Sequence, residues 1–259
     1  RKKRKKPFFD DKIQTDLNCH WVSSIIKSSL ILEDPNLMNS AIKFYELLEK
    51  RLNNNMFHTE KNANIPAFLE DYTYYSKMLI DIYECTGEIK YLNKAEKSML
   101  ETWELFFDKK KEILHKNPLK KNDLFVNPID INDNNIPNGN SVYLNNCLKL
   151  ELITNKAEWK NKLDALKKSY HSFINLNSTQ MFSFIKILDM CDNSISFTFY
   201  GEKYLNSEIK TKLQKKYFGK ATFIYKIHKN DNFIIVCKNQ TCSDKLTTIE
   251  NIEKYLNNF

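Results

Sequence analysis

The sequence predicts a mainly α-helical protein of antiparallel helices, followed by a small α/β appendage. Apolar residues recur at helical spacing in seven segments up to about residue 190, and beyond that point they alternate with period two. The 259 residues include only 4 glycines and 6 prolines, which suits packed helices better than a turn-rich all-β fold. The hydrophobic fraction of 42%, with 17 phenylalanines and 13 tyrosines, is typical of a globular chain.

The first four predicted helices each carry one apolar face. Their apolar positions are Val22, Ile25, Ile26 and Leu30; Leu37, Ala41, Phe44, Leu48 and Leu52; Phe68, Tyr72, Tyr75, Leu79, Ile82 and Tyr83; and Leu92, Ala95, Met99, Trp103 and Phe106. Pro35 marks the break between the first two, and Gly87 is expected to end the third in the left-handed cap geometry. The stretch from Phe107 to Pro137 is rich in Lys, Asn and Asp, and loops of such length are usually functional or mobile.

The turn at residues 136–142 is expected to open the fifth and most apolar helix. Pro137 fixes φ, Gly139 tolerates left-handed backbone, and Asn140 or Ser141 can accept a hydrogen bond from the free amides of the first turn. The apolar residues that follow are Val142, Leu144, Cys147, Leu148, Leu150, Leu152 and Ile153. They leave only a narrow polar strip, so we expect neighbouring helices to enclose this one.

The remaining chain completes the helical part and forms the appendage. A sixth helix carries Trp159, Leu163, Leu166, Tyr170 and Phe173, and a seventh is expected from Thr179 to Met190. Short strands are expected at residues 195–199, 223–225 and 233–236, with helices from Glu202 to Lys216 and from Ile249 to Leu256. We therefore predict a helical domain at residues 1–191 and an α/β appendage at residues 192–259.

The positive charge of the chain is concentrated at its start. The formal net charge is +8, and the first six residues, Arg1 to Lys6, are all basic, which leaves +2 for the rest. A solvated end is commoner than a nucleic-acid-binding arm, so nucleic-acid binding is disfavoured. No apolar run reaches the roughly 18 residues of a membrane span, and no secretory signal is visible, so no membrane partner is expected. Because the chain opens on Arg in a motif-like segment, we expect it to be a fragment of a longer protein.

The six cysteines are scattered through the chain rather than arranged as a disulfide scaffold. They are Cys19, Cys85, Cys147, Cys191, Cys237 and Cys242. This usage indicates a reducing, cytoplasmic location. Cys237 and Cys242 follow a predicted strand with four residues between them, and no further pair of ligands lies nearby, so no metal site is expected. A redox pair and two packed thiols both remain open for them.

Polar residues gather where the first, third and fifth predicted helices begin. Short loops make consecutive helices antiparallel, so these three starts share one end of the protein, here named the mouth. The mouth carries Asp10, Asp11, Lys12 and Asn18; Glu70, Asp71 and Tyr72; and Asn140 and Ser141. Three helix N-termini add partial positive charge, and a ligand with hydroxyls or an anionic group would suit this end.

These stretches resemble the family of YyaL and spermatogenesis-associated protein 20. The matching motifs are Arg1-x-x-Arg4-x-x-Pro7-x-x-Asp10-Asp11-Lys12 with Asn18, Phe68-Leu69-Glu70-Asp71-Tyr72, Tyr91-Leu92-x-x-Ala95, Asp133-x-x-x-Pro137-x-Gly139-Asn140-Ser141 and Val236-Cys237-Lys238-Asn239-Gln240-Thr241-Cys242. The resemblance extends over essentially the whole chain. It implies half of an (α/α) toroid akin to those of sugar epimerases and unsaturated glucuronyl hydrolases, in a family that also has a thioredoxin-like domain.

The chain departs from the pattern of this family at three places. Cys19 stands where the family has glycine, Asn138 replaces a serine, and Lys109-Lys110-Lys111 replaces a glycine-rich segment. These changes affect the shape of the mouth and of its loop. No Cys-x-x-Cys occurs, so the thioredoxin-like domain itself is absent from this sequence. The family brings no assigned reaction with it, and the likeness to sugar enzymes is an analogy of fold.

Four carboxylates of the mouth are candidate acid/base catalysts: Asp11, Glu70, Asp71 and Asp133. Neighbouring residues on a helix lie about 100° apart, so Glu70 and Asp71 cannot both face a ligand. Two carboxylates from different helices could flank a glycosidic or hemiacetal oxygen. The alternative for each of these carboxylates is a structural role, in which its negative charge at the start of a helix complements the helix dipole.

The candidate binding residues are Lys12, Asn18, Tyr72, Asn140 and Ser141. Lys12 could hold an anion or form a salt bridge with a neighbouring aspartate. For His20 and His58, which belong to no matched motif, structural or surface roles are favoured. No cofactor is expected.

The sequence therefore predicts the C-terminal part of a thioredoxin-domain toroid protein with a carbohydrate-enzyme-like mouth, acting on a sugar or polyol. We expect Asp71→Asn to abolish stabilisation by sugar without unfolding the protein. The alternative is a non-catalytic interaction module that pairs with a thioredoxin-like half or with itself, because an incomplete ring leaves apolar helix flanks uncovered.

Overall fold

A computed structural model describes residues 4–9, 11–53, 55–59, 65–120, 125–227, 232–239 and 241–257. Within these ranges the protein is mainly helical, as predicted. The larger part consists of α1 (Thr15–Leu32), α2 (Pro35–Leu52), α3 (Leu69–Thr86), α4 (Ile89–Phe106), α5 (Gly139–Thr154), α6 (Ala157–Asn177) and α7 (Phe182–Asp192). No helix in these ranges is both long and apolar enough to cross a membrane.

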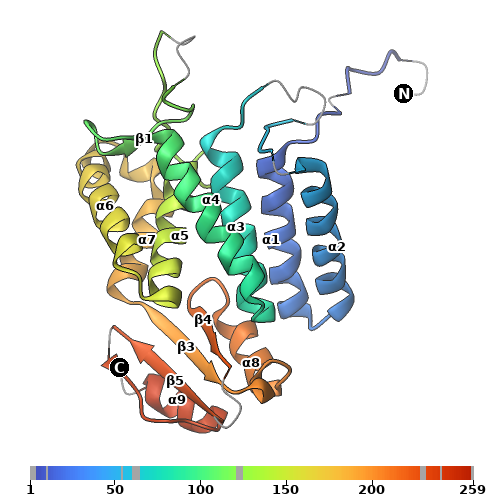
Figure 1. The fold of residues 1–259 in the computed structure, drawn as a ribbon, viewed down its shortest axis with the longest axis vertical. Helices are drawn as coiled ribbons and strands as arrows, with labels where there is room; N and C mark the ends of the chain where they lie inside the picture. The colour runs from blue at the N-terminus through green and yellow to red at the C-terminus, as the bar shows by residue number, and fades with distance from the viewer. Residues whose placement is uncertain are drawn as a thin grey trace.

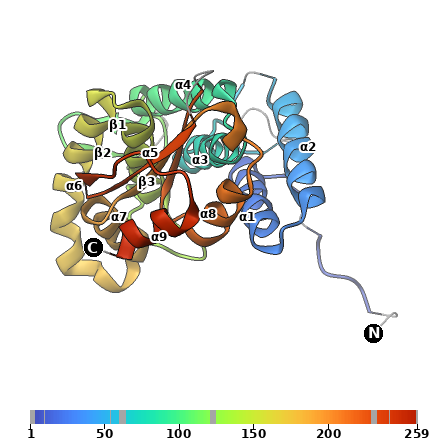
Figure 2. The same cartoon turned by 90° about the horizontal axis from the view of Figure 1, so that it is seen from below.

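The seven helices lie in two layers (Figures 1 and 2). Helices α1, α3, α5 and α7 form the inner layer, in which each contacts the next, while α2, α4 and α6 pack outside against the helix that precedes them. Because each inner helix is joined to its outer partner by a short connection, the two run antiparallel. Helices α1, α3 and α5 accordingly begin at the same end of the molecule, which confirms the shared mouth.

Helices α3 and α5 are enclosed by their neighbours. Side chains on every side of α3 are buried, including Leu69, Tyr74, Met78 and Leu79, which are all 0% exposed. In helix α5, eleven of the twelve residues from Gly139 to Leu150 are buried, and some of them are polar. The predicted enclosure of the fifth helix is therefore confirmed, and these two helices carry much of the main core.

Local signals set most helix ends. The side chain of Asp34 caps α2 by accepting from the backbone N–H of Asn36 at 2.8 Å, with Pro35 at the first helical position. Gly87 ends α3 with φ 75°, as predicted. The expected cap of α5 is wrong by two or three residues: Asn138, not Asn140 or Ser141, is the N-cap, and its side chain accepts from the N–H of Ser141 at 2.9 Å.

The long connection between α4 and α5 contains a small hairpin that the sequence pattern did not predict. Strand β1 (Phe107–Asp108) pairs antiparallel with β2 (Ile113–Leu114), and the lysine run lies in the turn between them. Ile113 and Leu114 are buried against the main core. Strands of two residues are too short to show a period of two, so only tertiary contacts reveal them.

The chain ends in the predicted α/β appendage, which lies beneath the C-terminal end of α3 in Figure 1. Its elements are β3 (Ile195–Tyr200), α8 (Glu208–Tyr217), β4 (Thr222–Lys226), β5 (Phe233–Lys238), β6 (Thr241–Cys242) and α9 (Ile249–Asn257). The strand order is β4-β3-β5-β6, with β3 parallel to β4 and antiparallel to β5. The helix expected from Glu202 begins only at Glu208, because residues 202–204 form a separate 3-10 turn.

The appendage binds the backbone at the end of α3. The hydroxyl of Tyr225 and the amide of Gln214 donate to the carbonyl of Glu84 at 2.5 Å and 2.6 Å, and Lys210 donates to the carbonyl of Cys85 at 2.8 Å. These bonds satisfy carbonyl groups that a helix end leaves without an intrahelical partner. The appendage has a core of its own, and the domain boundary at residue 191 stays a prediction.

Candidate functional site

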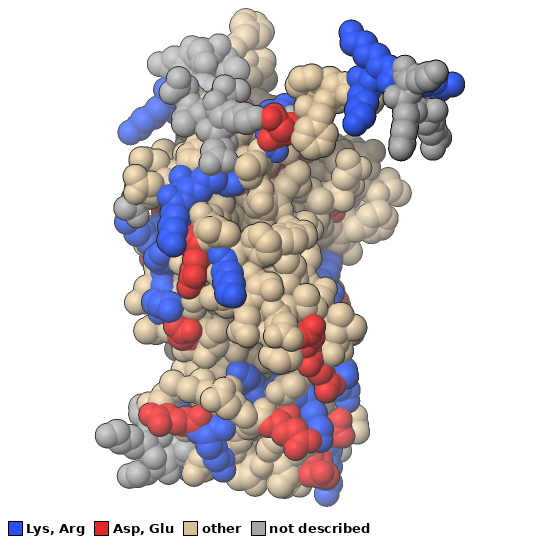
Figure 3. Space-filling model, turned by 90° about the vertical axis from the view of Figure 1, so that its right-hand side faces the viewer, with Lys and Arg blue, Asp and Glu red and all other residues tan. Residues whose placement is uncertain are grey.

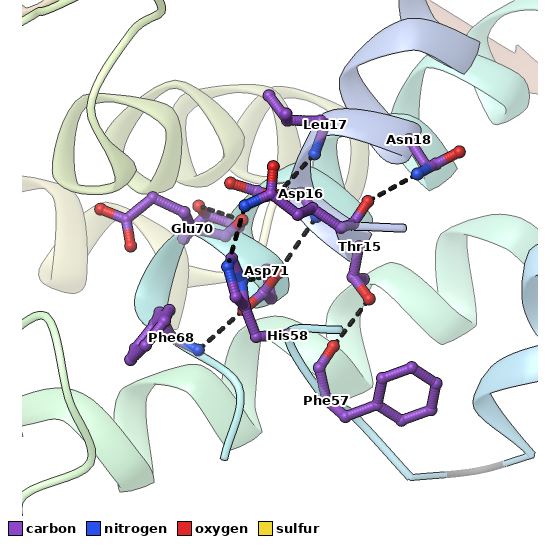
Figure 4. Close-up of polar contacts among 11 residues, drawn as sticks. Thr15, Asp16, Leu17, Asn18, Phe57, His58, Phe68, Glu70 and Asp71 are labelled. Atoms are coloured by element: carbon purple, nitrogen blue, oxygen red, sulfur yellow. Dashed lines mark hydrogen bonds and ion pairs between the residues drawn. The ribbon is translucent and has the colours of Figure 1, made fainter. Parts of the chain in front are cut away.

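Asp71 joins the starts of α1 and α3 (Figure 4). Its carboxylate is 0% exposed and accepts from the backbone N–H of Phe68 at 2.8 Å, which closes the first turn of α3. The other oxygen accepts from the N–H of Asp16 at 3.1 Å, in the first turn of α1. Asp71 thus satisfies free amides of two helices at once, a structural use of both oxygens.

His58, from the segment before α3, completes this cluster. Its Nδ1 lies 3.1 Å from Oδ2 of Asp71, and the hydrogen bond to Asp71 raises the pKa of the imidazole against the opposing effect of burial. Burial and the charge of Asp71 raise the pKa of Asp16. Asp16, His58 and Asp71 are also the described residues whose ligand atoms lie close enough to share a cation, within 4.8 Å of one another. Since both Asp71 oxygens already bind backbone amides, the arrangement favours a structural pair over a metal centre.

Glu70 turns away from Asp71 and reaches the start of α5, as their spacing on the helix requires (Figure 4). A β-carbon added to Gly139 would lie 3.2 Å from Oε1 of Glu70, so the carboxyl rests against the first turn of α5. Its Oε2 is buried and has no hydrogen-bond partner among the described residues. Burial raises the pKa of Glu70, assisted by the charge of Asp130. Glu70 is therefore the predicted carboxyl whose surroundings most favour the protonated form.

Asp133 and Asn140 hold the backbone around the start of α5. Asp133 accepts from the N–H of Asn138 at 3.1 Å and from the N–H of Ser183 at 2.7 Å, which ties α5 to α7. The amide of Asn140 donates to the carbonyl of Asp130 at 2.7 Å, while its oxygen accepts from a buried tyrosine hydroxyl. Both side chains are thus committed to protein partners.

The other predicted mouth residues do not converge on one point. Asp11 and Lys12 precede α1 and are exposed, whereas Asp10 lies outside the described residues. Asn18 is half-buried and donates to the carbonyl at position 14 at 2.6 Å. The Tyr72 hydroxyl donates to Glu101 on α4 at 3.3 Å, which directs it to the outer layer.

A cavity of about 420 Å³ lies between the inner helices and the segment before β4. Its wall is formed by His20, Ser23, Ser24 and Lys27 of α1; Lys77 and Asp81 of α3; Pro137, Ser141, Val142, Asn145 and Lys149 at α5; Ser183, Lys186 and Ile187 of α7; and Phe218 with Gly219. Ser141, one of the predicted binding residues, is therefore in the wall. Cavities of this size accommodate small organic ligands.

Two buried polar atoms of the α1 wall residues lack partners. The Ser23 hydroxyl, on a residue only 5% exposed, and Nδ1 of His20 make no hydrogen bond within the described chain. Buried polar atoms are nearly always paired, so such atoms indicate groups that bind water or a ligand. Burial and the charge of Lys77 lower the pKa of His20, which keeps its imidazole neutral at pH 7.

His20 connects the cavity to the mouth. Its ring contacts Tyr74 edge-on, with centroids 5.1 Å apart, and the Tyr74 hydroxyl donates to the carbonyl of Pro137 at 2.7 Å. Burial raises the pKa of Tyr74, and the charges of Asp16, Asp133 and Glu70 raise it further. Tyr74 thus links His20 of the cavity wall to the start of α5 at the mouth.

The sequence prediction missed the α1 wall and assigned His20 a structural or surface role. One signal was available: polar side chains four positions apart on otherwise apolar inner helices. These pairs are His20 and Ser24, Lys77 and Asp81, and Asn145 and Lys149. Only the packing of α1, α3 and α5 shows that the three polar strips face one space.

A wider hollow of about 540 Å³ lies on the outer layer between α4 and α6. One of its carboxylates is already paired: Glu96 accepts from Nε1 of Trp159 at 3.1 Å and from Lys156 at 2.6 Å. No predicted site residue lines it. The inner cavity, with its partnerless buried atoms, is the better candidate site.

Cys237 and Cys242 form a disulfide bond in the appendage. They are directly opposite each other on the antiparallel strands β5 and β6. Of the two alternatives that the sequence left open, a pair of packed free thiols is therefore wrong, while Cys19, Cys85 and Cys147 are buried free thiols. Redox activity of the pair stays a prediction.

No protein-family model matches the chain. An uncharacterized protein of Caenorhabditis elegans, B0495.5, is 22% identical over 297 residues, and the alignment covers all of this chain but 40% of that protein. The chain thus spans well under half the length of this relative.

Two solved structures are similar to the fold. Cellobiose 2-epimerase from Bacillus thermoamylovorans is 12% identical with a TM-score of 0.49, covering 64% of this chain and 46% of that one. A glycoside hydrolase family 76 mannosidase from Bacteroides thetaiotaomicron is 16% identical with a TM-score of 0.46, covering 62% of this chain and 44% of that one.

Proposed function

We propose that the inner cavity binds a sugar or polyol and that the chain supplies the acid/base site of a carbohydrate-converting enzyme. The observation that carries this proposal is the cavity wall, in which hydroxyl, amide, imidazole, ammonium and carboxylate groups from four helices surround about 420 Å³. A ligand rich in hydroxyl groups can donate to and accept from such a wall. The partnerless Ser23 hydroxyl is the group that a ligand of this kind would satisfy.

Glu70 is our candidate for proton transfer, and neutral His20 is the candidate base beside the ligand. Glu70 lies one helical turn above Tyr74 on α3, and Tyr74 contacts His20 in the cavity wall. A raised pKa favours the protonated form of a carboxyl, from which it can donate a proton to a sugar oxygen. The sequence resemblance adds the proposal that this site belongs to one half of an (α/α) toroid in a larger protein with a thioredoxin-like domain.

The binding proposal is tested by calorimetry with neutral hexoses and polyols on the wild type and on Ser23→Ala. Because the Ser23 hydroxyl has no protein partner, its removal should leave the melting temperature unchanged and weaken binding by about 2- to 10-fold. Ser28→Ala on the exposed side of α1 is the matched control and should bind as the wild type does. No binding by any sugar or polyol, anionic derivatives included, would refute the proposal.

The proton-transfer assignment needs a separate variant, Glu70→Gln. It should keep ligand affinity and lose turnover with any sugar that the wild type converts, since glutamine preserves shape but carries no titratable proton. If the Glu70→Gln variant converts the sugar at the wild-type rate, another residue must carry the acid/base role.

An apolar surface on α1 and α2 favours a second function, that of an interaction module. Leu17, Trp21, Phe44 and Leu47 are 42–59% exposed, and the rings of Trp21 and Phe44 touch with centroids 4.4 Å apart. Figure 3 shows this side of the molecule as a broad area with few charged side chains. Self-association or a thioredoxin-like partner would bury it. Sedimentation of the wild type and of Leu47→Asp, with Leu176→Asp on α6 as the control, tests this alternative: a monomer in all three excludes self-association.

A further inference from the structure

The charges of the cavity wall do not balance. Four lysines, Lys27, Lys77, Lys149 and Lys186, face the space, against one wall carboxylate, Asp81. The excess is unexpected because the body of the chain outside its basic start is nearly neutral. A cavity with one sign of charge attracts ligands of the opposite sign.

Two of these lysines are neutralised by the protein itself. Lys77 forms an ion pair with Asp81, and Lys149, only 3% exposed, forms one with the fully buried Glu84 and lies 4.0 Å from Asp81. Lys77 and Lys149 are therefore neutralised by Asp81 of the cavity wall and by Glu84, which lies outside the wall.

The other two lysines remain uncompensated. No carboxylate within the described ranges lies in ion-pair distance of Lys27 on α1 or Lys186 on α7, and neither ammonium makes a hydrogen bond there. Partial burial lowers the pKa of Lys186, and Lys27 is the neighbouring charge that lowers it most. Two ammonium groups in the wall of one cavity, on α1 and α7, are thus close enough to repel each other.

We infer that the cavity binds a sugar that carries an anionic group, a carboxylate or a phosphate, held between Lys27 and Lys186. An anion between them would turn this repulsion into two attractive contacts, while the sugar hydroxyls reach Ser23 and His20 higher in the cavity. This inference rests on the proposed sugar site and specifies the class of its ligand.

The test compares each of glucose, mannose and galactose with its uronic acid and its 6-phosphate, and with inorganic phosphate, by calorimetry on the full chain. We expect an anionic derivative to bind at least about 10-fold more tightly than its neutral parent, with the advantage decreasing as salt is added. The uronates and the phosphates distinguish the two sources of negative charge.

Substitutions of the two lysines test where the anionic group of the sugar binds. Lys186→Gln and Lys27→Gln should each weaken binding of the anionic sugar by about 10-fold and weaken binding of the neutral sugar by a much smaller factor. Neither lysine has a protein partner to lose, so both variants should fold. Lys43→Gln, which removes the same charge from an exposed position on α2, is the matched control.

The outcomes separate the inference from the proposed function. Equal affinity for neutral and anionic sugars would overturn the anionic class and leave the sugar site in place. Inorganic phosphate bound as tightly as the sugar phosphates would retain the lysine site and overturn the sugar site. No binding by any probe would overturn both, and so would tight binding that is insensitive to both lysine variants and to Ser23→Ala.

Discussion

Asp71→Asn should destabilise the fold, contrary to the expectation from the sequence that it acts only on ligand binding. Asparagine has one side-chain oxygen where aspartate has two, so it can accept from the N–H of Phe68 or of Asp16 but not from both. Losing one hydrogen bond to a charged acceptor costs about 1.5–3 kcal/mol, and the partly exposed pair with His58 adds up to about 1 kcal/mol. The expected loss is about 2–4 kcal/mol, which lowers the melting temperature by roughly 10 °C in a chain of this size.

The matched control is Asp34→Asn, the same chemical change at the cap of α2. Asp34 accepts one backbone hydrogen bond, from Asn36, and asparagine caps a helix about as well as aspartate does. Its cost should stay within a few tenths of a kcal/mol. Urea denaturation followed by circular dichroism measures both variants.

The destabilisation should also depend on pH. The pKa of His58 is raised in the folded protein by its hydrogen bond to Asp71, so the pair contributes its full stability below the unfolded-state pKa of about 6.5. This contribution is lost as the pH rises through the higher folded-state pKa. The difference between the wild type and Asp71→Asn should therefore shrink from pH 6 to pH 8. If Asp71→Asn is as stable as Asp34→Asn at pH 6, the structural role of Asp71 is refuted. Asp71 would then again be a candidate ligand-binding residue.

Three further predictions concern the lower half of the molecule. Lys149→Met should cost about 3–5 kcal/mol in urea denaturation because it leaves the Glu84 carboxylate buried without its cation, and adding Glu84→Gln should recover most of the loss. Gly87→Ala should cost about 1–3 kcal/mol, since its φ is 75° and a β-carbon would lie 2.7 Å from a side chain of the appendage; an unchanged melting temperature would contradict this. Alkylation followed by mass spectrometry should label Cys237 and Cys242 only after treatment with dithiothreitol, and labelling that reduction does not change would rule out a reducible disulfide.

Features that depend on residues close together in the chain, such as helix ends, were predictable from the sequence. Pro35 and Gly87 mark helix ends because φ is a local property, and the structure confirms both. The apolar pattern of α5 likewise predicted its enclosure. The helical spacing of Glu70 and Asp71 predicted that they point apart, as they do.

The partners of those side chains were not predictable. Asp71 binds His58, 13 residues earlier, and Asn140 donates to the carbonyl of Asp130, ten residues earlier, across connections without a fixed period. A pattern shows that a polar residue begins a helix, but it does not distinguish a buried hydrogen bond from a ligand contact.

The sequence by itself determined the helices, their order and the end at which the inner ones begin, because propensity, caps and short connections act over a few residues. Only the tertiary structure decided which polar groups share a space. Lys27 and Lys186 lie far apart in the chain on helices that do not follow one another, yet they border one cavity. Burial, charge balance and the lack of a partner are properties of that packed arrangement, and they identify the candidate site.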